Sequence, residues 1–111
     1  MCPDDARKVV LILEDALKLV ESAAVVTSVR IVERSDAAWA EILFRLRGKS
    51  SRTLGWRAPL PSDLGERPEV ELLSGVAVAL DEWIGLEAAR YLERHRADPS
   101  EILFVNPSDR T

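Results

Sequence analysis

The sequence predicts an α+β fold in which an antiparallel sheet of three or four strands packs against two helices, in the order α-β-β-β-α-β. Apolar residues recur at steps of three and four near the start and again in the second half, which is typical of amphipathic helices. Between these segments apolar and polar residues alternate, which is typical of strands with one buried side. With 111 residues, 47% hydrophobic and 31% charged, the chain fits a single domain over residues 1–111.

The first helix is expected over residues 4–22. Val9, Leu13 and Leu17 follow one another at four-residue steps and therefore share one helix face. Pro3 suits the first turn, where a missing N–H leaves no hydrogen bond unmade. Acidic residues follow directly and complement the positive end of the helix dipole.

Three strands are expected over residues 26–33, 39–47 and 53–58. The middle one has the clearest pattern, because Ile42 and Phe44 belong to an apolar series that alternates with mostly charged positions. Short polar connections separate the three segments, and their lengths fit antiparallel hairpins. The three segments therefore predict a meander.

A loop is expected over residues 59–67, since the chain from Ala58 to Pro68 contains three prolines and a glycine. Loops of this length are common places for function. A short apolar stretch over residues 101–105, bounded by prolines, predicts a last strand that joins the sheet or reaches for a partner.

The second helix is expected over residues 68–96. Apolar residues keep helical spacing along this segment, acidic residues follow Pro68, and basic residues end the segment. Ser74 and Gly75 leave an alternative open, because residues 70–80 also fit a hairpin or a short separate helix. Alanines at the alternate positions favour the helix, since alanine is a good helix former and a poor strand former.

The formal net charge of -4 hides an uneven distribution. Residues 30–57 carry seven basic and three acidic residues, whereas residues 58–111 carry five basic and eleven acidic residues. An acidic chain is a poor candidate for a protein whose main ligand is a phosphate backbone. A surface with two signs suits docking of another protein or a second copy, although scattered charge also serves to keep a small protein in solution.

Residues suited to metal, redox or nucleophilic chemistry are scarce. Cys2 and His95 are the only cysteine and histidine, and they lie far apart in the sequence, so we predict no metal site and no cofactor. No phosphate-binding glycine motif or nucleophile motif occurs, and we assign no catalytic residue. The single cysteine, the acidic start and the lack of a long apolar run predict a cytoplasmic protein without a membrane segment.

The best candidate for a binding surface is the side of the sheet that carries Trp39 and Leu43. Both fall in the outward register of their strand, and tryptophan is favoured at interface hot spots. If both helices cover the other side, these two residues are left for a partner, whereas helices on both sides would make them core. Trp56 and Trp83 are expected in the core. The predicted partner-binding residues are Trp39, Leu43, Arg45 and Arg47 on the sheet face, with Lys49 and Arg52 at the hairpin tip.

The function expected from these features is non-catalytic binding of a protein. The partner is either a second copy of the chain or a protein, such as a toxin or secreted effector, that this protein neutralises or escorts. One alternative is a small-ligand protein or enzyme with a pocket between loop 59–67 and the second helix, where Glu82, Tyr91 or His95 would be the acid or base.

A second alternative is RNA binding through the basic hairpin between the second and third strands. The order of elements is that of a double-stranded RNA-binding domain, a class that recognises RNA mostly by shape and backbone contacts. The second helix begins with an acidic turn at residues 68–71, which would repel phosphate. Nucleic acid is therefore the less favoured partner.

Overall fold

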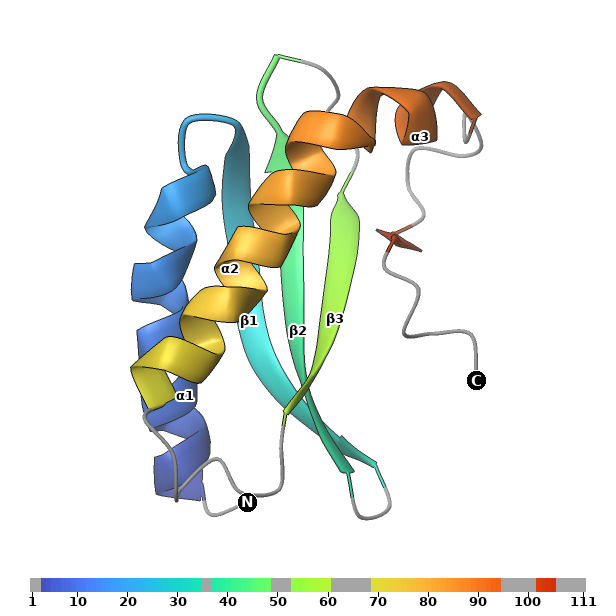
Figure 1. The fold of residues 1–111 in the computed structure, drawn as a ribbon. Coiled ribbons are helices and arrows are strands. Elements are labelled where there is room, and N and C mark those ends of the chain that lie inside the picture. The colour runs from blue at the N-terminus through green and yellow to red at the C-terminus, as the bar shows by residue number, and fades with distance from the viewer. Residues whose placement is uncertain (1–2, 35–36, 49–52, 61–68, 95–101, 106–111) are drawn as a thin grey trace.

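The computed structural model describes residues 3–34, 37–48, 53–60, 69–94 and 102–105. Within these ranges the chain forms an N-terminal helix, three long strands, two further helices and a short last strand (Figure 1). The elements are α1 (Pro3–Ala16), η1, a 3-10 turn (Leu17–Val20), β1 (Ala24–Arg34), β2 (Ala37–Leu46), β3 (Leu54–Leu60), α2 (Glu69–Leu86), α3 (Ala88–Arg94) and β4 (Leu103–Phe104). The predicted α+β class is confirmed.

The strands form one sheet in the order β1-β2-β3-β4. The first three strands pair antiparallel, as predicted for the meander, with Ile42 of β2 opposite Val29 of β1 and Trp56 of β3. β4 pairs parallel to β3, which differs from a wholly antiparallel sheet. The helices between β3 and β4 supply the long connection that parallel pairing requires.

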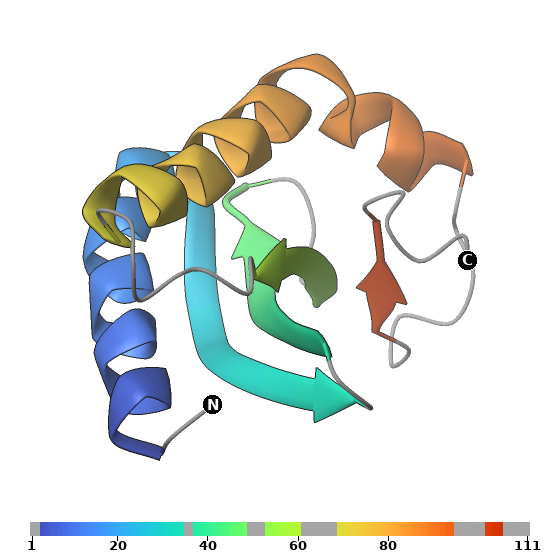
Figure 2. The same cartoon turned by 60° about the horizontal axis from the view of Figure 1, so that its bottom comes forward.

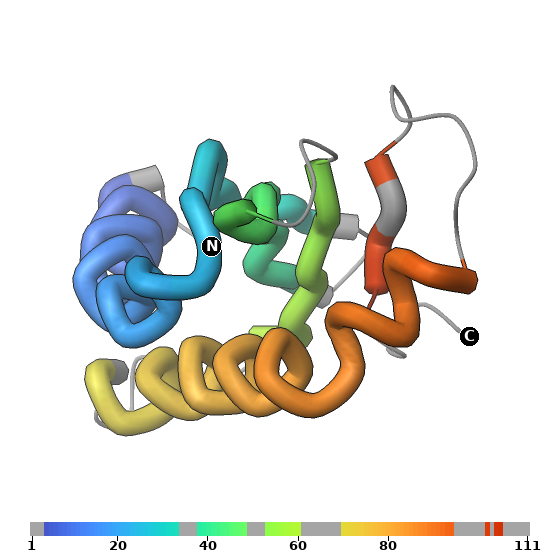
Figure 3. Tube along the Cα trace, turned by 90° about the horizontal axis from the view of Figure 1, so that it is seen from above, coloured from blue at the N-terminus to red at the C-terminus, as the bar shows by residue number. Residues whose placement is uncertain are grey.

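Both long helices lie on the same side of the sheet. α1 runs beside β1, and α2 crosses in front of the strands (Figures 1 and 2). Seen from above, no described helix lies on the opposite side (Figure 3). None of the helices in the described part of the chain is long and apolar enough to cross a membrane.

The core lies between these helices and the side of the sheet that they cover. Trp83 of α2 is central to it, because its ring centroid lies 6.3 Å from that of Phe44 and 6.2 Å from that of Trp56. The prediction that Trp56 and Trp83 are core residues is confirmed. The largest fully buried side chains are Val9, Leu13, Val20, Ile42, Phe44, Leu54, Leu73 and Leu80.

The first helix ends differently from the prediction of residues 4–22. α1 stops at Ala16, and a 3-10 turn follows, in which the N–H of Glu21 donates to the carbonyl of Lys18 at 3.2 Å. The N–H of Ala23 donates in the same way to the carbonyl of Val20 at 2.9 Å. No glycine is present here to cap the helix, so bonds between residues three apart satisfy the last carbonyl groups.

The second predicted helix, residues 68–96, is divided between α2 and α3. The N–H of Glu87 donates to the carbonyl of Trp83, and the N–H of Tyr91 donates to the carbonyl of Glu87, both at 2.9 Å. The division falls at Glu87, two residues after Gly85, a residue type that weakens a helix. Across it, the Tyr91 ring of α3 lies 5.6 Å from the Trp83 ring of α2. Ser74 and Gly75 lie inside α2, so the helical alternative for residues 70–80 is confirmed.

The third strand extends beyond the predicted residues 53–58. Pro59 and Leu60, which the sequence places in loop 59–67, belong to β3. Proline is tolerated there because β4 pairs with β3 only at Leu54 and Gly55, so no described strand needs the missing N–H of Pro59 on that outer edge. Residues 61–67 of the predicted loop lie outside the described residues.

Candidate functional site

Trp39 and Leu43 lie on the side of β1, β2 and β3 that faces away from the helices, which we refer to as the open face. On β2, Ala40, Ile42 and Phe44 are buried on the helix side. Because side chains alternate along a strand, the odd-numbered neighbours project to the open face. Trp39 and Leu43 are half-buried there. Both long helices cover the other side, so Trp39 and Leu43 lie on a face that no described helix covers.

Trp39 is the middle member of an apolar row across the open face. Val32 of β1 and Pro59 of β3 lie opposite it in the register of the sheet. Pro59 is exposed, and Val32 is half-buried. Residues directly opposite on adjacent strands have neighbouring side chains, so the row forms one continuous apolar strip.

A buried carboxylate lies one row further along the open face. Glu41 of β2 is only 3% exposed although it projects away from the core. The Nε and Nη2 of Arg30 lie 2.8 and 2.6 Å from Oε1 of Glu41, and the Nε of Arg57 donates to Oε2 at 3.2 Å. Each carboxylate oxygen therefore has its own arginine, which compensates the buried charge and cross-links the three long strands.

Leu43 has Gly55 opposite it on β3 and the ring of Phe104 beyond. A Cβ at Gly55 would overlap the Cδ1 and Cε1 atoms of that ring. The N–H of Val105 donates to the carbonyl of Gly55 at 2.9 Å, which secures β4 next to β3. The guanidinium carbon of Arg57 lies 3.8 Å from the centroid of the Phe104 ring, a cation-π contact. The C-terminal strand thus adds an aromatic ring to the open face.

The accessible charge of the open face is positive in the part that the structure describes. Arg45 is exposed, and the side chain of Arg30 is 65% exposed. The acidic group among these residues, Glu41, has a side chain that is 4% exposed and already paired. This sign is opposite to the net charge of -4 of the whole chain.

The other predicted site residues do not join this group. The backbone N–H of Arg47 donates to the carbonyl of Ala23 at 2.9 Å, and its Nε donates to the carbonyl of Glu21 at 2.7 Å. These bonds tie the end of β2 to the turn before β1 and hold Arg47 away from Trp39. Lys49 and Arg52 lie outside the described residues. Of the six predicted residues, the structure therefore brings together Trp39, Leu43 and Arg45.

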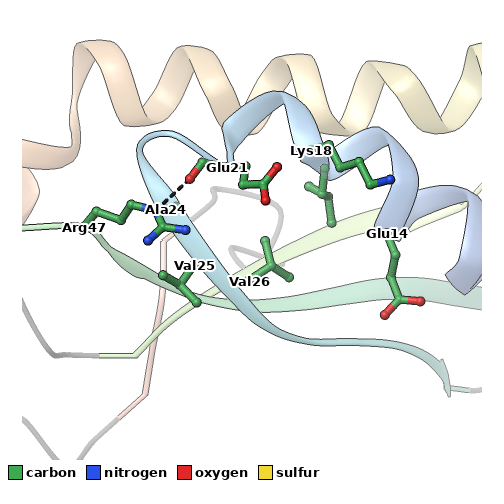
Figure 4. Close-up of a pocket in the computed structure, with 8 residues that line it drawn as sticks. Glu14, Lys18, Glu21, Ala24, Val25, Val26 and Arg47 are labelled. Carbon is green, nitrogen blue, oxygen red and sulfur yellow. Dashed lines mark hydrogen bonds between the residues drawn. The ribbon is translucent and has the colours of Figure 1, made fainter.

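Arg47 instead lines a pocket of about 280 Å³ between the first helix and the start of β1 (Figure 4). Its rim carries Glu14 and Glu21 together with Lys18 and Arg47, so the formal charges balance. The remaining lining residues are apolar: Leu17, Ala24, Val25 and Val26. A balanced rim favours neither an anionic nor a cationic ligand.

A second hollow, of about 240 Å³, lies between α1 and α2. Leu11 and Val70 line it and are 61% and 62% exposed. This apolar patch belongs to the helix layer, on the side of the molecule opposite the open face. It is a second place where a protein could bind, and it offers a matched comparison for the open face.

The residues considered as acid or base do not form a described pocket. Glu82 is exposed on α2, Tyr91 is half-buried against Trp83, and neither lines the two hollows above. His95 lies outside the described residues. Within those residues no group of three histidine, cysteine or acidic side chains is arranged to hold a metal ion.

Comparison of the chain with models of protein families, with curated proteins and with solved structures found no match.

Proposed function

We propose that this protein binds another polypeptide through the open face and carries out no catalysis there. The observation that supports the proposal best is that Trp39 and Leu43 are only half-buried on a sheet face that no described helix covers. Covering apolar surface contributes roughly 25 cal/mol per Å². Trp39 and Leu43 lie four positions apart on the same face of β2, and Val32 and Pro59 lie opposite Trp39 on the neighbouring strands. Together these residues supply the apolar centre that such interfaces use.

The buried ion pairs of Glu41 support the same proposal. Arg30 and Arg57 reach this carboxylate from the two neighbouring strands, so β1, β2 and β3 are linked on the very side that would meet a partner. A surface that is already ordered loses less conformational entropy on binding than a mobile one. The open face thus combines partly accessible apolar side chains with strands that are cross-linked by ion pairs.

The experiment is affinity capture of the tagged chain from its native cell extract, with mass spectrometry of the bound proteins and light-scattering mass of the purified protein. We expect a stoichiometric partner or a homodimer with the wild-type chain. Trp39→Ser combined with Leu43→Ser should abolish the association and leave the circular dichroism spectrum unchanged, because both residues lie outside the core.

The matched control is Leu11→Ser combined with Val70→Ser, which removes an equal number of apolar side chains from the helix layer. This variant should keep the association. If the control variant lost binding and the open-face variant kept it, the interface would lie on the helices and not on the open face. A wild-type chain that is monomeric and captures nothing would contradict the proposal, and unfolding of the open-face variant would show that Trp39 and Leu43 are core.

A further inference from the structure

The charge around the apolar residues of the open face indicates what kind of partner it fits. Arg45 follows Leu43 by two positions on β2 and therefore projects from the same face, roughly 7 Å further along the strand. Arg30 lies in the row next to Trp39 and keeps 65% of its side chain exposed. Exposed cations thus border the apolar residues within one repeat of the strand.

The acidic group on the described open face does not offset these cations for an incoming partner. Glu41 is buried between Arg30 and Arg57, and both of its oxygens are already occupied by nitrogen donors. The guanidinium of Arg30 keeps part of its surface toward solvent, and Arg45 is exposed. A carboxylate placed beside either arginine would gain a charge-assisted hydrogen bond, whereas a lysine there would be repelled.

We infer that the open face binds a polypeptide segment in which apolar side chains are flanked by aspartate or glutamate. This inference rests on the proposed function and names the partner's chemistry. A segment that covers Trp39 and Leu43 would place its flanking residues beside Arg30 and Arg45. Selectivity then follows from charge, since a segment flanked by basic residues meets like charge at the same positions.

A second copy of the chain fits the open face less well. A two-fold contact brings the same surface patch of both copies together. Each copy would then present Arg30 and Arg45, while the carboxylate of Glu41 stays buried in both. The described cations would face one another without an accessible acidic partner. Charge therefore favours a different polypeptide over self-association.

The test uses a phage library of random 12-residue peptides, selected on the immobilised full chain and counter-selected on the Trp39→Ser, Leu43→Ser variant. We expect the recovered sequences to contain leucine or aromatic residues within two or three positions of aspartate or glutamate. A synthetic peptide of the consensus sequence is then titrated by fluorescence polarisation. Arg45→Glu should weaken its binding roughly tenfold, because reversal replaces an attraction with a repulsion of similar size.

Lys18→Glu is the matched control. It changes the net charge by the same amount at an exposed site on the helix layer, where the lysine side chain is 72% exposed. This variant should bind the peptide within about twofold of wild type, since Lys18 lies in η1 and not on the open face, and salt screens its exposed charge. A similar loss in both variants would show that only net charge matters, which would overturn the inference.

The other outcomes separate this inference from the proposed function. The recovered peptides could need Trp39 and Leu43 for binding but show no enrichment in acidic residues and no effect of Arg45→Glu. That result would overturn the inference that the partner is acidic, while the open face would remain a binding site. Recovery of no selective peptide, a homodimer joined through the open face, or tight binding of an oligouridine probe that needs Trp39 would also overturn it. The capture experiment above tests the proposed function independently.

Discussion

Substitution of Gly55 by alanine tests how β4 is attached to the sheet. Gly55 has no unusual backbone torsion, since the described glycine with positive φ is Gly48, so alanine is allowed at this position by its backbone. The obstacle is the ring of Phe104, which occupies the space where the new Cβ would lie. The ring must move, and its movement disturbs the contact with Arg57.

The expected free energy has three parts. Overpacking against the ring costs roughly 1 to 3 kcal/mol. Loss of the cation-π contact costs about 0.5 to 1 kcal/mol. Alanine stabilises a strand by about 0.5 to 1 kcal/mol relative to glycine, because the unfolded glycine chain has more freedom to lose. The last two terms are of similar size and opposite sign, so we expect Gly55→Ala to destabilise the protein by about 1 to 3 kcal/mol.

The assay is urea unfolding followed by tryptophan fluorescence, in the wild-type chain and in a Phe104→Ala background. Without the ring the same substitution should stabilise the fold by about 0.5 to 1 kcal/mol, so its sign reverses between the two backgrounds. The cost in the wild-type background corresponds to a fall of about 0.5 to 1.5 M in the urea concentration at the unfolding midpoint, for a slope of about 2 kcal/mol per M. An equal cost in both backgrounds would refute the reasoning, because the ring of Phe104 would then not be what disfavours a larger residue at position 55.

Substitutions at five further positions have expected outcomes that equilibrium unfolding can check. Phe44→Ala should cost about 3 to 5 kcal/mol, because its side chain is fully buried and meets the central tryptophan of the core; a cost below 1 kcal/mol would contradict that packing. Gly48→Ala should cost about 1 kcal/mol and Gly48→Asn less, since φ is 70° and no atom lies within 4 Å of a new Cβ, so the cost is conformational. Glu41→Gln should cost about 1 to 3 kcal/mol. Arg57→Ala should cost more than Arg30→Ala, because the Arg57 side chain is 24% exposed against 65% for Arg30 and also contacts the Phe104 ring; the reverse order would contradict this reasoning.

The fold was largely predictable because the middle strands follow a simple alternation. Ile42 and Phe44 alternate with outward residues, and this pattern alone places Trp39 and Leu43 on the other face. Which of these faces the helices would cover, and whether they would cover both, depends on tertiary packing. The sequence therefore predicted that a face would stay open if both helices packed on one side, but it could not predict on which sides they would pack.

Other parts of the site depend on contacts between distant residues. Arg30, Glu41 and Arg57 are far apart in the sequence and meet only through the strand register, so their ion pairs could not be recognised beforehand. Phe104 reaches the open face because the register between β4 and β3 sets it beside Gly55. The glycine at position 55, inside an alternating strand, was a usable signal, since such a glycine often marks the close approach of another group.

Arg47 shows the limit of alternation at the end of a strand. Its odd number predicts the same face as Arg45, but its Nε bonds to the carbonyl of Glu21 instead. The regular pattern ends with β2 at Leu46, and beyond that point a local hydrogen bond determines the direction of the side chain. The alternation of side chains therefore predicts their direction only within the paired part of a strand.

The irregularity in β1 affects how this protein behaves at high concentration. β1 is 11 residues long and is the outermost strand on its side of the described sheet. Long, regular outer strands are templates for pairing with other molecules and so promote aggregation. Here the register shifts between Val26 and Ser28, and the hydroxyl of the intervening Thr27 donates to the carbonyl of Leu43 at 3.2 Å. A straight strand from another molecule would not match both halves of this edge in one register, so the single extra residue should hinder edge-to-edge pairing.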